Sequence, residues 1–545
     1  MKELLRRLKL QPILSGEAGL ASLFANILAL ATPLFVIQVL NRYLSYGVNA
    51  TLLTLTIGVL IAIAAEFAFR NLRLQLAQEV AGESDERLGI GVFGLLLTAR
   101  TNALEARPPG ERVELVRGVE NAQTALGAAN IVALSDLPYS FLILLVLYLL
   151  APRLALITAL FIGVAIVIGW IGHRRLQAPI QQLGAASERV SSLLGATVAC
   201  GDAIRQFGGQ GVIMDRWIQA TKTAGQLRAA VAARQTSLAS LGAAIQGLMT
   251  VTVIAAGAPL VVAGQLDTGG LIGANLIAAR ALLPFTRFMH LLAAFEKADE
   301  SLAAAQRFAA VPVEPADGTQ LPVFRGGLEL CDLSYQGPEY PTPLFAGLSL
   351  SLEPGGVVAV TGRNGSGKSS LIRVVVGLLE PSAGKVLADG VDLRQIDLAW
   401  WRHQVMYLPQ ELNFLDGSIR DNLLAARPEI DDAQIRACLD RAGILSFIDG
   451  HPDGLDLLLV GGGRNLAPGL RRRLGLARAL AVDGSLVVFD EPTEGLDRQG
   501  AEVVYALLID LARSGRTILV VTHDAAIQRG AQTVLDMDTL VRESA

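Results

Sequence analysis

Apolar runs dominate the first half of the chain and follow one another in pairs separated by polar segments. A helix that crosses a bilayer needs about 20 apolar residues at about 1.5 Å each. The pattern therefore predicts six transmembrane helices, the second run being the centre of a longer helix. The six runs occupy residues 20–40, 52–65, 131–150, 154–172, 238–265 and 271–288.

The positive charges between these runs predict the orientation of the helices. Four basic residues precede the first run, and the connections 70–130 and 173–234 are long and rich in arginine. The short segments 41–50 and 264–270 contain only Arg42 as a positive residue. Because positive loops stay in the cytoplasm, we expect both termini and both long connections on that side.

The long connections are longer than a simple turn requires. Residues 72–125 and 176–227 have helical patterning with charged faces, so we expect the transmembrane helices to continue into the cytoplasm. Glycine and proline interrupt both segments, and short crosswise helices that touch the second half of the chain are expected there. An ordinary solvated helical hairpin is the alternative. The interruptions are Pro108-Pro109-Gly110, Gly201 and Gly208-Gly209.

One arginine, Arg280, lies inside the sixth apolar run. A charge in lipid is costly, so this side chain should face the protein interior or a partner. A role along a substrate path and a pairing with an acidic residue of another helix both stay open.

The composition supports a membrane protein. The chain has 545 residues, of which 52% are hydrophobic and only 18% charged, and its mean hydropathy is +0.46. The net charge of −4 gives no argument for a nucleic-acid partner. The three cysteines stand far apart, which indicates neither a metal site nor a disulfide framework.

The second half of the chain has the pattern of an α/β domain. Residues 311–327 shift to Pro, Gly and Asp and predict a linker between a membrane domain, 1–310, and a second domain, 328–545. In the second domain short β-rich runs alternate with helical patterns.

A complete phosphate-binding loop separates a predicted buried strand, 357–361, from a predicted helix, 369–378. Its glycines let successive backbone N–H groups surround phosphate oxygens at a helix N-terminus. The lysine should reach the β- and γ-phosphates, and the first serine after it should bind Mg²⁺. The loop is Gly362, Arg363, Asn364, Gly365, Ser366, Gly367, Lys368 and Ser369, with Ser370 following.

Three polar residues follow two other predicted buried strands. Asp490 ends the run 486–489, and its carboxylate is placed to hold Mg²⁺ directly or through water. Glu491 comes next and is the best candidate to orient or deprotonate the attacking water. His523 follows the strand 517–521 and can sense the γ-phosphate. These segments together indicate an ATP-hydrolysing domain.

From about residue 328 to the end, the sequence resembles the nucleotide-binding domain of ATP-binding cassette (ABC) transporters. The resemblance implies that Gln410 contacts Mg²⁺ and relays to the membrane domain. It implies that Tyr335 stacks on adenine, with Tyr340 as the alternative, and that Asp497, in the segment 494–497, lies at a dimer interface. The implied cofactors are ATP and Mg²⁺.

One motif departs from that family. The family's signature, Leu-Ser-Gly-Gly-Gln, binds the γ-phosphate of the nucleotide held by the opposite subunit. Here the serine hydroxyl is absent, and a proline removes one backbone N–H. Each lost phosphate contact costs about 1.5–3 kcal/mol, which predicts slower turnover; tolerated drift in a slow ATPase is the alternative. The residues at these positions are Leu466, Ala467, Pro468, Gly469 and Leu470.

The membrane half resembles type I secretion ABC exporters. The residues that carry the resemblance are 33–42, Asp136-Leu137-Pro138 and the segment from Gly270 to Leu282. The implied fold is a six-span α-helical transmembrane domain of the type I ABC exporter fold plus an α/β P-loop nucleotide-binding domain. The implied cargo is an unfolded polypeptide, exported through the bacterial inner membrane, with a periplasmic adaptor and an outer-membrane channel as partners.

The resemblance also implies a dimer of two half-transporters in the lipid membrane. A homodimer would carry the changed signature twice, whereas a heterodimer with an intact partner would keep one competent site. The retained Glu491 and His523 favour the heterodimer. The sequence also leaves open a lipid or small-molecule exporter and a non-transporting ATP-dependent regulator.

Overall fold

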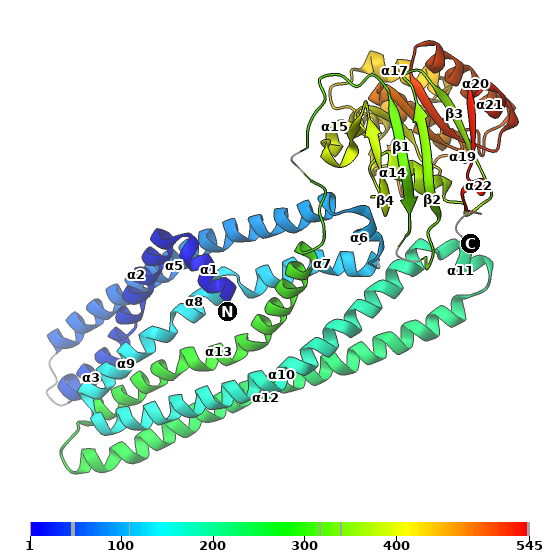
Figure 1. Cartoon of the computed structure of the whole chain (residues 1–545). Helices are drawn as coiled ribbons and strands as arrows, with labels where there is room; N and C mark the ends of the chain where they lie inside the picture. Colours follow the sequence, from blue (N-terminus) through cyan, green and yellow to red (C-terminus); the bar gives the residue numbers. More distant parts are fainter. Residues whose placement is uncertain (1, 45–48, 108, 316–317, 338–339, 542–545) are drawn as a thin grey trace. The chain divides into compact units, whose positions relative to one another are not determined.

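The computed structural model describes residues 2–44, 49–107, 109–315, 318–337 and 340–541 (Figure 1). It divides into two compact units. The membrane unit consists of residues Met1–Leu97 and Arg107–Val311, and the α/β unit of Thr98–Ala106 and Pro312–Ala545. The predicted domain limits at 310 and 328 stay predictions.

In the described part of the membrane unit, six helical segments are long and apolar enough to cross a membrane. The prediction of six spans is confirmed, and the chain is a multi-pass membrane protein. A short helix, α1 (Lys2–Leu10), precedes them. The spans are α2 (Pro12–Leu28) with α3 (Ala31–Gln38) and the π-helix η1 (Val39–Tyr43), α5 (Asn49–Thr98), α8 (Ala128–Ser135) with α9 (Leu137–Leu150), α10 (Pro152–Ala199), α12 (Gln210–Val262) and α13 (Thr268–Ala309).

Four of these segments, α9, α10, α12 and α13, share one buried apolar core. Leu147, Leu154, Met249 and Ile277 are completely inaccessible to solvent in it. Gly172 of α10 permits a close approach of α12, because a Cβ at this position would overlap the side chain of Leu238. Small residues at such crossings are what membrane helices use to pack closely.

A buried ion pair interrupts the otherwise apolar third span. Arg73 of α5 donates to Asp136, which separates α8 from α9, over 2.6 Å. Asn26 of α2 donates to the same carboxylate oxygen over 2.9 Å. A charge inside a membrane protein needs such a partner, so these contacts explain how Asp136 is tolerated and tie three spans together.

The spans α5 and α10 continue well beyond the length of a bilayer crossing, as predicted. The two interruptions are short helices, α6 (Thr101–Glu105) and α11 (Gly201–Gln206). The second falls between the predicted glycine breaks. The first lies before the proline segment rather than at it, because α7 (Pro109–Ala125) uses its proline as a favourable first helical residue. Pro108 lies outside the described residues.

Helix α6 packs within the α/β unit, which confirms the expected contact of the first crosswise helix. Glu105 pairs with Arg373 over 2.5 Å, and Arg100, just before the helix, pairs with Glu380. Asn102 accepts a hydrogen bond from the Tyr335 hydroxyl over 3.3 Å. Helix α11 belongs to the membrane unit, and for it the contact stays a prediction.

The centre of the α/β unit is a parallel sheet with the strand order β11-β3-β10-β9-β6. An antiparallel sheet of order β2-β1-β4-β5 packs beside it over a second apolar core (Figure 1). The strands are β1 (Leu328–Tyr335), β2 (Phe345–Leu352), β3 (Val357–Thr361), β4 (Ala383–Ala388), β5 (Val391–Asp392), β6 (Val405–Leu408), β7 (Gly417–Ser418), β8 (Leu458–Leu459), β9 (Leu486–Asp490), β10 (Thr517–Val521) and β11 (Thr533–Asp536).

Helices cover the parallel sheet and complete a larger apolar core around β9 and β10. The register pairs Val521 of β10 with Val360 of β3 and with Asp490 of β9. The carboxyl ends of three strands therefore meet at one edge. The helices are α14 (Lys368–Val375), α15 (Leu398–Arg402), α16 (Ile419–Leu424), α17 (Asp432–Arg441), α18 (Leu445–Gly450), α19 (Pro468–Val482), α20 (Arg498–Arg513), α21 (Ala525–Gly530) and α22 (Asp538–Val541).

Candidate functional site

The phosphate-binding loop joins β3 to α14 at the carboxyl edge of the parallel sheet. Gly365 and Gly367 have φ values of 86° and 87°, in the left-handed region that favours glycine. A Cβ at Gly367 would lie 2.9 Å from the Phe345 ring, so this position is closed to a side chain on space as well. The loop thus turns the chain into the N-terminus of α14, where backbone N–H groups are free to bind an anion.

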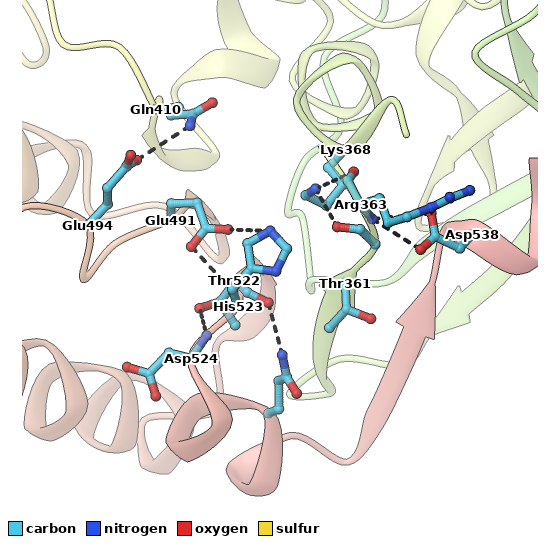
Figure 2. Close-up of polar contacts among 12 residues, drawn as sticks. Thr361, Arg363, Lys368, Gln410, Glu491, Glu494, Thr522, His523, Asp524 and Asp538 are labelled. Carbon is cyan, nitrogen blue, oxygen red and sulfur yellow. Dashed lines mark hydrogen bonds and ion pairs between the residues drawn. The ribbon is translucent and has the colours of Figure 1, made fainter. Parts of the chain in front are cut away.

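The side chain of Lys368 is folded across its own loop. Its ammonium donates to the carbonyl oxygens of Gly362 and Arg363 over 2.7 and 2.9 Å (Figure 2). Asp538 of α22 accepts the backbone N–H of Arg363 over 3.2 Å. The Ser366 hydroxyl is buried and, among the described residues, has no hydrogen-bond partner. The loop therefore holds its lysine and one free hydroxyl where phosphate oxygens would arrive.

Asp490 ends β9 and is only 2% exposed. Burial raises the pKa of its carboxyl group, while a hydrogen bond from the Ser369 hydroxyl and the charges of Arg472 and Lys368 lower it. A carboxylate beside a hydroxyl is an oxygen ligand set of the kind that Mg²⁺ prefers. The structure therefore brings the expected metal ligands Ser369 and Asp490 together.

Glu491 turns away from the sheet in a left-handed backbone conformation, with φ 47°. Its carboxylate accepts the backbone N–H of His523 over 3.4 Å, and the His523 imidazole lies 3.6 Å from its other oxygen (Figure 2). That other oxygen is buried without a hydrogen-bond donor in the described chain. Burial raises the pKa of the Glu491 carboxyl group, and His523 lowers it. A desolvated carboxylate with an unused oxygen suits a group that takes a proton from water.

The turn after β10 holds His523 in place. The backbone N–H of Thr522 donates to the Val360 carbonyl of β3 over 3.1 Å, and the Thr522 hydroxyl accepts the N–H of Asp524 over 3.0 Å. Asp524 in turn caps α21 by accepting the N–H of Ala526 over 2.8 Å. The imidazole thus extends from a turn fixed at both sides (Figure 2).

Gln410 lies two residues beyond β6, and its side chain is exposed. The amide donates to Glu494 over 3.4 Å (Figure 2), and no other side-chain hydrogen bond of Gln410 is found in the described residues. The expected contact of Gln410 with Mg²⁺ and its relay to the membrane domain stay predictions.

The arginine Arg472 was not predicted to take part in the site. It is 4% exposed, and its guanidinium donates to the carbonyls of Pro409, Gln410 and Glu491 over 3.0, 3.1 and 2.8 Å. It also lies 3.3 Å from the Glu494 carboxylate. One cation therefore holds together the loop that carries Gln410, here called the glutamine loop, and the loop that carries Glu491.

A signal for Arg472 is present in the sequence. Arg471, Arg472 and Arg473 follow directly on the first residues of α19. The N-terminus of a helix carries a partial positive charge and disfavours cations. An arginine at this position therefore indicates acceptors outside the helix. For Arg472 these are the carbonyl groups of two loops. For Arg473 the acceptor is the Asp497 carboxylate, at 3.1 Å.

The segment expected to be the changed signature, residues 466–470, leads into α19 and forms its start. Ala467 is the N-cap residue and has no side chain that could cap the helix, and Pro468 is the first helical residue. Both are exposed, whereas Leu466 is buried and Leu470 packs on the core. Proline is favourable at a first helical position, because the missing N–H would be unpaired there. The residues at these positions are therefore compatible with the helix. What they change is the set of groups that the exposed end of the helix can offer to a ligand. Gly469 supplies the first free backbone N–H of the helix.

Asp497 caps the next helix, α20. Its carboxylate accepts the N–H of Gly500 over 2.8 Å, and the side chain is largely exposed. This local role is visible in the structure, and its expected position at a dimer interface stays a prediction.

The adenine-stacking role expected for Tyr335 stays a prediction. This side chain is 5% exposed, packs beside Phe345 with ring centroids 6.3 Å apart, and ends on Asn102. The ring is therefore largely covered by the protein in this structure. Two register irregularities of β1 against β2, after Leu330 and after Leu333, precede Tyr335 on this buried face.

Comparison with known proteins agrees with this geometry. A family model described as the ABC transporter transmembrane region matches residues 16–283, and one described as ABC transporter matches residues 345–494. Among curated proteins, the chain is 29% identical to the cyclolysin secretion/processing ATP-binding protein CyaB of Bordetella pertussis, over 96% of this chain and 74% of the relative.

Two further similarities bear on the cargo and the fold. The alpha-hemolysin translocation ATP-binding protein HlyB of Escherichia coli O157:H7 is 27% identical, again over 96% of this chain and 74% of the relative. A solved structure of a bacterial Atm1-family ABC exporter with ATP bound superimposes with a TM-score of 0.84 over 98% of this chain and 97% of that chain. At 20% identity the latter similarity concerns the fold alone.

The contacts of Arg472 predict a specific kinetic defect. In the variant Arg472→Met, three buried carbonyl groups lose a charged donor, each worth about 1.5–3 kcal/mol. We expect kcat for ATP hydrolysis to fall at least about tenfold, with KM for ATP little changed, because the phosphate-binding loop is untouched. Steady-state ATPase kinetics measure both constants, with Arg472→Met introduced into a chain whose residues 467–470 are replaced by Ser-Gly-Gly-Gln, so that the reference activity is high.

Two variants accompany that measurement. Arg472→Lys keeps the charge but not the planar fork and should recover part of kcat. Arg498→Met alters an exposed arginine of α20 and should leave both constants unchanged. A lowered melting temperature with unaltered kcat in Arg472→Met would reduce Arg472 to a structural residue.

Proposed function

The chain is an ABC exporter half-transporter, distantly related to the ATP-binding proteins of type I secretion, and we propose that it exports an unfolded polypeptide across the bacterial inner membrane. It is an ATP-hydrolysing translocase with one membrane domain and one ABC domain. The observation that carries the proposal is that a complete hydrolytic edge and six spans occur in one chain that resembles toxin secretion proteins over 96% of its length. The cytoplasmic orientation of both termini, a periplasmic adaptor and an outer-membrane channel belong to the same proposal.

We assign the hydrolytic roles from the geometry of the edge. The backbone of residues 362–369, with Ser370 behind it, holds the phosphates, and Lys368 turns from its own loop carbonyls to the β- and γ-phosphates. Ser369 and Asp490 hold Mg²⁺, with Gln410 joining them once nucleotide is bound. Glu491 activates water, and His523 contacts the γ-phosphate.

Half-transporters function as dimers, and the changed signature bears on which dimer this chain forms. The start of α19 offers neither a serine hydroxyl nor the N–H of residue 468 to a nucleotide on a second subunit. The hydrolytic edge of the same chain retains Asp490 beside Ser369 and His523 in contact with Glu491. We propose a heterodimer, in which an intact signature of the partner completes the site that this chain builds.

ATPase assays on three forms of the chain test the heterodimer. The native chain alone should be nearly inactive, and replacement of residues 467–470 by Ser-Gly-Gly-Gln should raise its rate by about tenfold or more, since each regained phosphate contact is worth about 1.5–3 kcal/mol. Adding Glu491→Gln to the restored chain should abolish the gain. Robust activity of the native chain, lost in Glu491→Gln, would instead indicate a homodimer with a working divergent signature.

The nature of the cargo is tested by reconstituting the signature-restored chain, which supplies both of its own sites, into proteoliposomes. A fluorescent, unfolded, carboxymethylated polypeptide should accumulate in the lumen with Mg-ATP, and Glu491→Gln should stop its accumulation. In a parallel arm, a fluorescent phospholipid should show no ATP-dependent flipping. The reverse pattern would favour a lipid exporter over a polypeptide exporter.

Tyr340 replaces Tyr335 in our proposal as the aromatic side chain that stacks on adenine. It is 52% exposed, and its ring lies beside Gly337, where an added Cβ would be 3.1 Å from the Tyr340 ring. Its backbone N–H donates to the Gly337 carbonyl over 3.1 Å. The chain then runs to Leu344, which packs against Gly367 of the phosphate-binding loop. The Tyr340 ring is thus exposed, and the segment that follows it reaches the phosphate-binding loop.

The variant Tyr340→Ala tests this assignment. Stacking of a base on an aromatic ring is worth about 1–3 kcal/mol, so the Kd for ATP should rise by roughly 5- to 150-fold in equilibrium binding to the Glu491→Gln background. Tyr335→Leu, which removes the ring but keeps an apolar side chain in the core, should leave the Kd unchanged. A Kd that responds to Tyr335→Leu and not to Tyr340→Ala would reverse the assignment.

A further inference from the structure

A mostly apolar cavity of about 220 Å³ lies among the helices of the membrane unit. Three polar side chains from three spans line it: Thr32 of α3, Gln246 of α12 and Arg280 of α13. The remaining lining is Pro33 and apolar residues of α13. The cavity is smaller than a typical pocket for a drug-sized ligand and is suited to a single side chain.

In the part of the chain that the structure describes, Arg280 has no hydrogen-bonded or ion-paired partner. Among the residues that the structure describes, no hydrogen bond or ion pair engages the side chains of Thr32, Gln246 or Arg280. The charges of Glu66 and Arg70 on α5 act on Arg280 from a distance. Those two side chains pair with each other over 2.6 Å, so Glu66 is neutralised by Arg70, and no described carboxylate forms an ion pair with Arg280.

Arg280 lies near the middle of the membrane-spanning part of the unit. Arg280 is twelve residues from the first residue of α13 at Thr268, which corresponds to about 18 Å of helix. Gln246 is sixteen residues from the last residue of α12 at Val262, or about 24 Å. In a hydrocarbon layer of about 30 Å both positions are far from the headgroups at the outer surface. An uncompensated charge is most costly at this depth.

We propose that Arg280, Gln246 and Thr32 form a mid-membrane site for a carboxylate side chain of the exported polypeptide. The proposal rests on the polypeptide-export function proposed above and names the chemistry by which the membrane unit would hold its cargo.

The three side chains match such a ligand. The planar guanidinium of Arg280 binds both oxygens of a carboxylate through parallel N–H donors. The amide of Gln246 and the hydroxyl of Thr32 add a donor each, and the Gln246 carbonyl accepts a cargo backbone N–H. The bound carboxylate neutralises Arg280 while it is present, so the site favours cargo over an empty cavity. A lipid phosphate offers related chemistry, but its headgroup lies at the membrane surface.

Peptide binding to the full chain tests the site. The chain, in nanodiscs of phosphatidylcholine, is titrated against a short, unstructured, fluorescent peptide rich in glutamate and against its twin with glutamine at every such position. By fluorescence anisotropy, the acidic peptide should bind about tenfold more tightly, as a charge-assisted hydrogen bond predicts. Arg280→Gln should remove this preference, and Arg280→Lys should retain part of it.

The controls separate this inference from the export function. Arg287→Gln alters an exposed arginine two turns further along α13 and should keep the full preference. Equal binding of both peptides to the native chain, or an undiminished preference in Arg280→Gln, would overturn the carboxylate site while leaving polypeptide export in place. Binding of neither peptide would overturn both. A preference abolished by phosphatidylglycerol in the nanodisc would identify lipid phosphate as the occupant.

Discussion

The parallel pairing of β3, β10 and β9 is the constraint on which the hydrolytic site depends. The register places Val360, Val521 and Asp490 side by side at the carboxyl edge of the sheet. The phosphate-binding loop, the His523 turn and Glu491 each follow directly on one of these three strands. Parallel strands end at the same edge of a sheet. The backbone pairing of the strands therefore brings the phosphate-binding loop and Glu491 together, although they are more than a hundred positions apart in sequence. A shift of one residue in either pairing would separate them.

Besides the strand pairing, one buried cation stabilises that edge. Arg472 reaches from α19 to carbonyls of the glutamine loop and the Glu491 loop. A guanidinium suits this position, because its fixed fork satisfies several carbonyl groups that would otherwise be buried without donors. Burial lowers the pKa of Arg472, whereas the carboxylates of Glu494, Asp490 and Glu491 raise it. The same cation therefore stabilises the negative charge that the hydrolytic edge collects, and it ties that edge to the helix that begins with the signature.

Local patterns predicted the elements well, and the contacts between distant elements less well. The six spans and the phosphate-binding loop depend on residues close in sequence, so periodicity and spacing were sufficient for them. The burial of Tyr335 accompanies irregular pairing between β1 and β2, which leaves no local signal. The role of Arg472 depends on two loops, after β6 and β9, that only the folded sheet brings within reach of α19. The first crosswise helix ends before its prolines because Pro109 starts a helix as readily as it interrupts one.

The form of the signature argues for a loss of ligand contacts rather than a loss of structure. An alanine at the N-cap costs about 0.5–2 kcal/mol of helix stability relative to serine, and a proline at the first helical position offsets part of that cost because its φ angle is already helical. Leu470 adds apolar contact with the core that a glutamine would not provide. The helix that carries Arg472 is thus preserved by the same substitutions that remove a hydroxyl and an N–H from its exposed end. Such a chain preserves its own hydrolytic edge but has fewer donors for the nucleotide of a second subunit. The proposed heterodimer requires this asymmetry between the two ATP sites.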